Sequence, residues 1–142
     1  DLLSFQRWVM FNYLIGNSDA HAKNISVLID ETGYALAPFY DLLCVQVYGD
    51  DRLALYIGDE DQYASIGAHS WEAICEDCGF SVKSTMTLFR KMAQDVAKAW
   101  ATVTAQATVD FALSRPELGL IQSITMVIET NCSAALSMTT KR

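Results

Sequence analysis

Three side chains with chemistry suited to phosphoryl transfer lie in the first third of the sequence. Asn24 follows Asp19 five residues later, and a second carboxylate, Asp41, comes after a short intervening segment. Phosphoryl transfer requires a carboxylate aimed at the acceptor hydroxyl and oxygen ligands for the magnesium that accompanies the phosphates. Asp19 can supply the first, and Asn24 with Asp41 can supply the second. These residue types indicate a candidate phosphoryl-transfer site.

The segment before the site is expected to anchor it. Residues 2–15 carry apolar side chains on nearly every side with a narrow polar stripe, which predicts a largely buried helix. Gly16 and Asn17 tolerate left-handed backbone angles and therefore favour a helix end that releases the chain into a loop. The loop of residues 17–24 would then start where a buried helix holds it.

The segment after the loop predicts a β-hairpin. Residues 25–29 and 34–37 are short apolar runs on either side of a turn-forming cluster, and Pro38 would stop the second strand. The hairpin would bring Asp41 back toward Asn24.

The remainder of the chain predicts helices. The run 53–57 is compatible with a strand, although the pattern there is weak. Ser70 is expected to cap a helix that ends before Gly79, and Ser114 with Glu117 forms a capping box. The expected helices span residues 71–78, about 84–108, and from Ser114 through Ala135. Repeats and linkers are not evident, so we expect one domain over residues 1–142.

The spacing of Asp19 and Asn24 matches the Asp-x-x-x-x-Asn core of the protein-kinase catalytic loop, a pattern that is weak by itself. Its context makes it specific, because the segments that carry it closely resemble the C-terminal domain of HipA-like serine/threonine kinases. The resemblance is strongest over residues 11–43. It is carried by Leu14-Ile15-Gly16-Asn17-Ser18-Asp19-Ala20-His21-Ala22-Lys23-Asn24, by the apolar strand, and by Leu36-Ala37-Pro38-Phe39-Tyr40-Asp41.

The resemblance implies a fold and a set of roles. It implies a mainly α, all-helical C-terminal kinase-like subdomain with one small β-hairpin and without the N-terminal lobe, in which residues 68–138 form the helical part. Asp19 would be the catalytic aspartate, and Asn24 and Asp41 would hold Mg²⁺ for ATP. His21 either contacts the transferred phosphate or makes a structural hydrogen bond, and Lys23 is either a phosphate neighbour or a solvated surface residue.

Composition and resemblance together bound the partners. Seventeen acidic against ten basic residues give a net charge of -7, which argues against a nucleic-acid-binding surface on this chain. The four cysteines are few, and no membrane-spanning run or leader is evident, so a cytoplasmic protein is expected. The resemblance implies a toxin with a protein substrate, of which an aminoacyl-tRNA synthetase is the best-known kind, and a DNA-binding antitoxin.

Other candidate sites carry less weight. Cys75 and Cys78 have the spacing of zinc or redox sites but lack a second pair, so we interpret them as core or half-buried positions. The acidic clusters at 50–51 and 59–61 lack a calcium-loop spacing and are interpreted as solvated loops. Trp8, Trp71 and Trp100 are expected to pack in the core, and His69 is left without a role.

Two further hypotheses remain open beside the kinase. The seven glycines are scattered and form neither a Walker loop nor a Gly-x-Gly-x-x-Gly loop, whereas the family carries a glycine-rich loop and a nucleotide-contacting lysine before this region. The chain is therefore interpreted as a fragment with weak or absent ATP binding that is inactive when isolated. It could also be an inactive pseudokinase that binds protein, or part of a kinase with a lipid or small-molecule acceptor.

Overall fold

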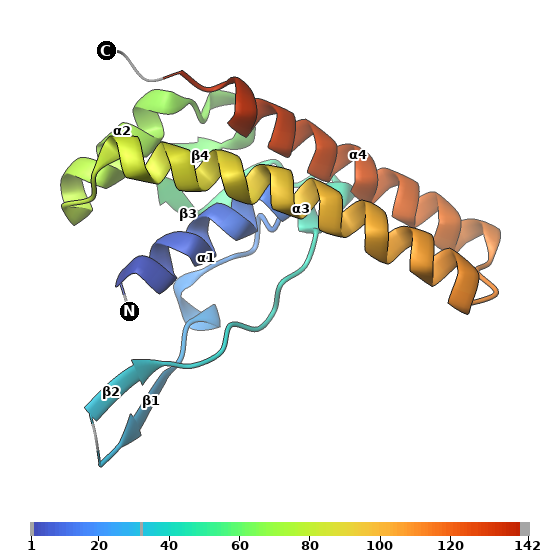
Figure 1. Ribbon diagram of the computed structural model, residues 1–142, viewed down its shortest axis with the longest axis horizontal. Coiled ribbons are helices and arrows are strands. Elements are labelled where there is room, and N and C mark those ends of the chain that lie inside the picture. The colour runs from blue at the N-terminus through green and yellow to red at the C-terminus, as the bar shows by residue number, and fades with distance from the viewer. Residues whose placement is uncertain (1, 32, 140–142) are drawn as a thin grey trace.

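The computed structural model describes residues 2–31 and 33–139, which form a mainly helical body and two small β-hairpins (Figure 1). The α-helices are α1 (Leu2–Ile15), α2 (Ala68–Cys78), α3 (Val82–Asp110) and α4 (Arg115–Ser137). The strands are β1 (Val27–Asp30), β2 (Gly33–Leu36), β3 (Arg52–Ile57) and β4 (Glu60–Gln62), and short 3-10 turns span Ala22–Asn24, Val45–Tyr48 and Tyr63–Ser65. The expected mainly α fold with a small hairpin is confirmed.

Helix α1 lies within the body and is buried as predicted, including part of its polar stripe. Leu14 and Met10 are fully buried, and the polar residues Gln6 and Asn12 are buried as well. A buried polar group is tolerated when it is hydrogen-bonded. Gln6 Nε2 donates to Thr85 Oγ1 at 2.8 Å, and Asn12 Nδ2 donates to the Trp8 carbonyl at 2.8 Å. Part of the polar stripe is thus internal, with Gln6 hydrogen-bonded to α3 and Asn12 to α1 itself.

The core is aromatic where α1, α2 and α3 meet. Trp71 and Phe89 have ring centroids 4.3 Å apart, and Tyr13 lies edge-on to Trp71 at 5.9 Å. All three are nearly inaccessible, and burial of each such side chain contributes roughly 1.5–3 kcal/mol. Helices α3 and α4 run side by side as a long pair above α1 (Figure 1). The C-terminal end of α1 is therefore held from several directions.

The helix boundaries differ in detail from the prediction. Helix α2 begins at Ala68 with Gly67 at its N-cap, and Ser70 lies one turn inside, where its Oγ accepts the Gly67 N–H at 3.2 Å. The prediction that Ser70 is the cap is therefore wrong, because its hydroxyl bonds backward to the cap residue. Helix α3 begins at Val82, since Ser81 Oγ accepts the Ser84 N–H at 3.4 Å.

The predicted capping box of α4 is present. The Glu117 carboxylate accepts both the Ser114 hydroxyl and the Ser114 N–H at 2.7 Å. These two hydrogen bonds hold the pKa of Glu117 below its usual range, and the bond from the Ser114 hydroxyl has the larger effect. The box therefore opens α4 as the sequence predicted.

A second hairpin, β3–β4, is present in addition to the predicted one. Strand β3 falls where residues 53–57 allowed it, and it pairs antiparallel with β4 in the acidic cluster. Arg52 Nε donates to Asp61 Oδ2 at 3.1 Å, so the cluster at 59–61 is partly paired and partly a strand. Gly58 turns the chain at φ +62, and a Cβ there would lie 2.8 Å from the Ser70 carbonyl.

The predicted hairpin, β1–β2, extends from the body (Figure 1). Its register pairs Val27 with Leu36 and Asp30 with Gly33, and every side chain of β1 is exposed. The hairpin connects Asn24 to Asp41, because it starts three residues after Asn24 and ends five residues before Asp41. The chain therefore comes back, after the hairpin, to the loop of residues 17–24.

Candidate active site

The candidate site begins where α1 ends. Gly16 takes a left-handed φ of +75, and its carbonyl accepts the Gln46 N–H at 2.9 Å. A Cβ at this position would lie 2.5 Å from Val127 Cγ1 of α4, so only glycine fits both the angle and the space. The start of the loop is consequently fixed between α1, α4 and the Val45–Tyr48 turn.

The loop itself alternates between buried and exposed residues. Asn17, Ser18 and Ala20 are buried, whereas the side chain of Asp19 is 62 % exposed. The Ser18 carbonyl accepts the Ala54 N–H at 2.8 Å, which ties the loop to β3. Asp19 is thus a solvent-facing carboxylate on a backbone whose neighbours are anchored in the core.

His21 lies beside Asp19. Its Nε2 is 4.0 Å from Asp19 Oδ1, and its backbone N–H donates to the Asp19 carbonyl at 2.9 Å. Its Nδ1 is buried and makes no hydrogen bond within the described residues. The imidazole therefore has one edge turned into the protein and one toward the exposed carboxylate.

Asn24 and Asp41 meet as the hairpin prediction required. Asn24 Nδ2 donates to Asp41 Oδ2 at 2.8 Å, with the Asn24 side chain buried and Asp41 on the surface. This hydrogen bond occupies the amide nitrogen, which cannot bind a cation, so the amide oxygen is the atom suited to a metal. One carboxylate and one amide oxygen fit Mg²⁺, which takes few protein ligands and completes its shell with water and phosphate oxygens.

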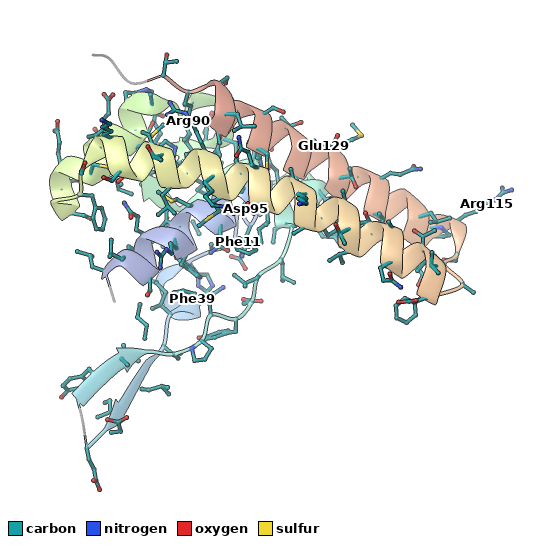
Figure 2. The ribbon with its side chains drawn as sticks, viewed as in Figure 1. Phe11, Phe39, Arg90, Asp95, Arg115 and Glu129 are labelled. Carbon is teal, nitrogen blue, oxygen red and sulfur yellow. The ribbon has the colours of Figure 1, made fainter. Side chains whose placement is uncertain are left out.

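Lys23 contributes its backbone to the site. Its side chain lies on the surface, and its carbonyl accepts the Tyr40 hydroxyl at 2.9 Å. The same hydroxyl lies 3.0 Å from Ser26 Oγ. Phe39 packs beneath α1 with its ring 6.0 Å from that of Trp8, at the junction of the body and the β1–β2 hairpin (Figure 2).

Two supporting asparagines were not predicted as site residues. Asn17 Nδ2 donates to the Asp41 carbonyl at 2.9 Å and to Asn12 Oδ1 at 2.7 Å. Asn131 of α4 donates to the Tyr13 carbonyl at 3.1 Å and to Gln46 Oε1 at 3.0 Å. Asn17 stands inside the motif, which was a signal that could have found it, whereas Asn131 stands 118 residues from Tyr13 and gives no local signal.

The remaining candidates are accounted for by packing. Cys75 is buried and Cys78 half-buried, as interpreted from the sequence, and both are free thiols. Trp8 and Trp71 are buried, and Trp100 is half-buried with its Nε1 donating to Thr125 Oγ1 at 2.8 Å. Over residues 2–31 and 33–139, no cluster of three or more His, Cys, Asp or Glu side chains suits a metal, and no helix is long and apolar enough to cross a membrane.

Similar proteins carry the names of kinases. A putative kinase, Y4mE of Sinorhizobium fredii, is 32% identical over 105 residues, which cover 72% of this chain and 25% of that protein. The serine/threonine-protein kinase toxin HipA of Shewanella oneidensis is 34% identical over 99 residues, covering 68% of this chain and 23% of that protein. The chain thus spans about a quarter of the length of the curated relatives it matches.

The family is shown by a match to a family model. The HipA-like C-terminal domain family matches residues 1–100, and the chain belongs to that family. A chain in the solved complex of HipA, HipB and operator DNA from the Shewanella oneidensis MR-1 toxin-antitoxin system superposes with a TM-score of 0.80 and 27% identity. That match covers 90% of this chain and 30% of the other. The structural match and the sequence match therefore point to the same family.

Proposed function

We propose that this chain is the C-terminal catalytic portion of a HipA-like serine/threonine protein kinase, which transfers the γ-phosphate of ATP to a protein hydroxyl. The observation that carries the proposal is the 2.8 Å hydrogen bond between Asn24 and Asp41, because Asn24 lies on the same anchored loop as the exposed Asp19. Phosphoryl transfer needs oxygen ligands for the metal and a carboxylate for the acceptor hydroxyl, all held in fixed positions.

Asp19 is the catalytic residue in this proposal. Its carboxylate accepts a hydrogen bond from the acceptor hydroxyl, orients that oxygen toward the phosphorus, and receives its proton as the new bond forms. The buried residues on either side of Asp19 limit its movement, so the orientation is established before the substrate arrives.

Asn24 and Asp41 are the proposed magnesium ligands, through the amide oxygen of the first and a carboxylate oxygen of the second. Bound Mg²⁺ would neutralise charge on the phosphates. The amide nitrogen of Asn24 holds the Asp41 carboxylate in place, which lowers the entropic cost of assembling the site. His21 and Lys23 are the proposed nucleotide-side residues, with His21 directed at the phosphate through the edge that faces Asp19.

The partners in the proposal follow the family. We propose a toxin whose substrate is a protein, possible examples being aminoacyl-tRNA synthetases, and whose activity a DNA-binding antitoxin neutralises in the cytoplasm. The Shewanella oneidensis HipA, HipB and operator DNA complex supports the antitoxin. The net charge of -7 supports the expectation that this chain does not itself bind nucleic acid.

A complete nucleotide site in this proposal also needs the glycine-rich loop and lysine that the resemblance places outside these residues. We therefore expect the 142 residues alone to bind ATP weakly and to transfer little phosphate. Calorimetric titration with ATP and Mg²⁺ tests this expectation, and micromolar affinity would contradict it.

The test of the function is phosphate transfer from radiolabelled ATP by the longest natural form of the protein that contains this chain. Asp19→Asn should reduce the transfer rate about 100-fold or more, because a general base typically contributes a factor of about 10²–10⁴. Asp59→Asn, which changes an exposed carboxylate away from the site, is the matched control and should leave the rate unchanged.

The outcomes separate the rival functions. Undiminished transfer by Asp19→Asn would refute the assigned role. Absence of transfer to any protein, with ATP bound, would favour a pseudokinase that acts as a binding module, and transfer to lipids or small molecules would favour the other alternative.

A further inference from the structure

Asp41 has a backbone conformation that needs support. Its φ of 58 makes it the non-glycine residue with a positive φ among the residues that the structure describes. A side chain in the left-handed region is disfavoured unless surrounding contacts hold it there. The direction of the Asp41 carboxylate depends on this φ angle. Contacts that stabilise the angle therefore also fix the direction of the proposed metal ligand.

The contact on the inner side comes from Asn17. Its side chain is 2 % exposed, and its Nδ2 donates two hydrogen bonds, to the Asp41 carbonyl at 2.9 Å and to Asn12 Oδ1 at 2.7 Å. Asn12 is in turn fixed to the Trp8 carbonyl of α1 at 2.8 Å. Two side-chain amides, those of Asn12 and Asn17, thus connect the backbone of the buried helix to the carbonyl of Asp41.

The contact on the outer side comes from Tyr40. Its hydroxyl donates to the Lys23 carbonyl at 2.9 Å and lies 3.0 Å from Ser26 Oγ. These two groups flank Asn24 in sequence. Tyr40, the residue before Asp41, therefore links that ligand to the segment that carries Asn24. It does so at the surface, where Tyr40 is 45 % exposed.

We propose that Asn17 and Tyr40 are positioning residues that set the distance and direction between Asn24 and Asp41, and so tune the affinity of the site for a divalent cation. The inference rests on the proposed function only in assigning Asn24 and Asp41 to the metal. Neither positioning residue touches the cation; each acts through the backbone that carries a ligand.

The test measures Mn²⁺ binding by the protein without nucleotide, from the electron paramagnetic resonance signal of free Mn²⁺. Tyr40→Phe removes one hydroxyl and should weaken Mn²⁺ affinity about 3- to 10-fold, a range that the loss of one net hydrogen bond gives. Asn17→Asp keeps the size of the side chain but sets a carboxylate against two oxygen acceptors, and it should weaken affinity at least about 10-fold.

The controls match each variant. Tyr48→Phe removes a hydroxyl from a tyrosine that is 78 % exposed and lies outside the site, and it should bind Mn²⁺ within about two-fold of the wild type. Gln6→Ala removes a different buried side-chain hydrogen bond from α1, so it should lower the melting temperature without changing Mn²⁺ affinity.

The outcomes are decisive in each direction. Wild-type affinity in Tyr40→Phe overturns the role of Tyr40, and wild-type affinity in folded Asn17→Asp overturns that of Asn17. If Asn17→Asp does not fold, Tyr40→Phe decides the inference, because its surface hydroxyl is not needed for the core. If Asp41→Asn binds Mn²⁺ as the wild type does, the metal site of the proposed function fails instead.

Discussion

Substitution of Gly16 by alanine should strongly destabilise the protein. Two effects add at this position. A left-handed backbone costs a residue with a Cβ about 1–2 kcal/mol, and φ is +75 here. The added Cβ would lie 2.5 Å from Val127 Cγ1, and insertion of a methyl group into a packed site costs about 1–3 kcal/mol.

The expected loss is therefore about 2–5 kcal/mol in the free energy of unfolding, from a total of about 5–15 kcal/mol typical of a domain. Urea unfolding followed by circular dichroism measures it. The matched control is Gly119→Ala on α4, where a Cβ would meet nothing within 4 Å; it should stabilise the helix by about 0.5–1 kcal/mol.

A second substitution separates the two effects. Val127→Ala alone should cost about 1 kcal/mol, since it removes two half-buried methyl groups. In the double variant most of the steric part of the Gly16→Ala penalty should disappear while the backbone part remains, which gives a favourable coupling energy of about 1–3 kcal/mol. A loss below about 1 kcal/mol for Gly16→Ala, or additive effects in the double variant, would refute the claim that α4 closes over the start of the loop.

Further expectations concern the groups that anchor the loop and its helices. Asn131→Ala should cost about 1–3 kcal/mol in urea unfolding, because it leaves the Tyr13 carbonyl and Gln46 Oε1 without their donor; a loss near zero would contradict the anchoring role. Burial raises the pKa of Tyr13 to about 12, helped by the nearby Cys132, so the native state keeps a proton that the unfolded chain releases above pH 10.0. Stability should consequently fall by about 2–3 kcal/mol as the pH rises from there to about 12, less steeply in Tyr13→Phe, and an equal pH slope in both proteins would argue against it. The pKa of Glu117 is held below its normal value of 4.5, so the stabilisation it gives is present above that pH and lost as the pH falls through the lowered value; the melting temperatures of Glu117→Gln and wild type should converge in acid.

The part of the site that depends on segments close together in the sequence could be predicted. Asn24 and Asp41 are 17 residues apart, and a hairpin between them has a recognisable pattern, so their meeting was predictable. The helices α3 and α4 were predictable for a similar reason, because their apolar positions recur at helical spacing and a capping box opens α4.

What could not be predicted depends on contacts between distant segments. Strand β4 consists of Glu60, Asp61 and Gln62, which resemble a solvated loop and become a strand only because β3 pairs with them. The sequence showed Gln6 and Asn12 only as part of a narrow polar stripe of α1, and their partners lie far from them or in the loop: Thr85 of α3 for Gln6 and Asn17 for Asn12. Tertiary partners of this kind override local patterns.

The proposal that Asp19, Asn24 and Asp41 form one phosphoryl-transfer site is tested most directly by the Mg²⁺ dependence of phosphate transfer in the longest natural form of the protein. Asp41→Asn should raise the Mg²⁺ concentration needed for half-maximal transfer at least about 10-fold, because it weakens a ligand by at least about 1.4 kcal/mol. Asp19→Asn should lower transfer at every Mg²⁺ concentration without moving the midpoint. An unchanged midpoint in Asp41→Asn, or full transfer in Asp19→Asn at saturating Mg²⁺, would contradict the account.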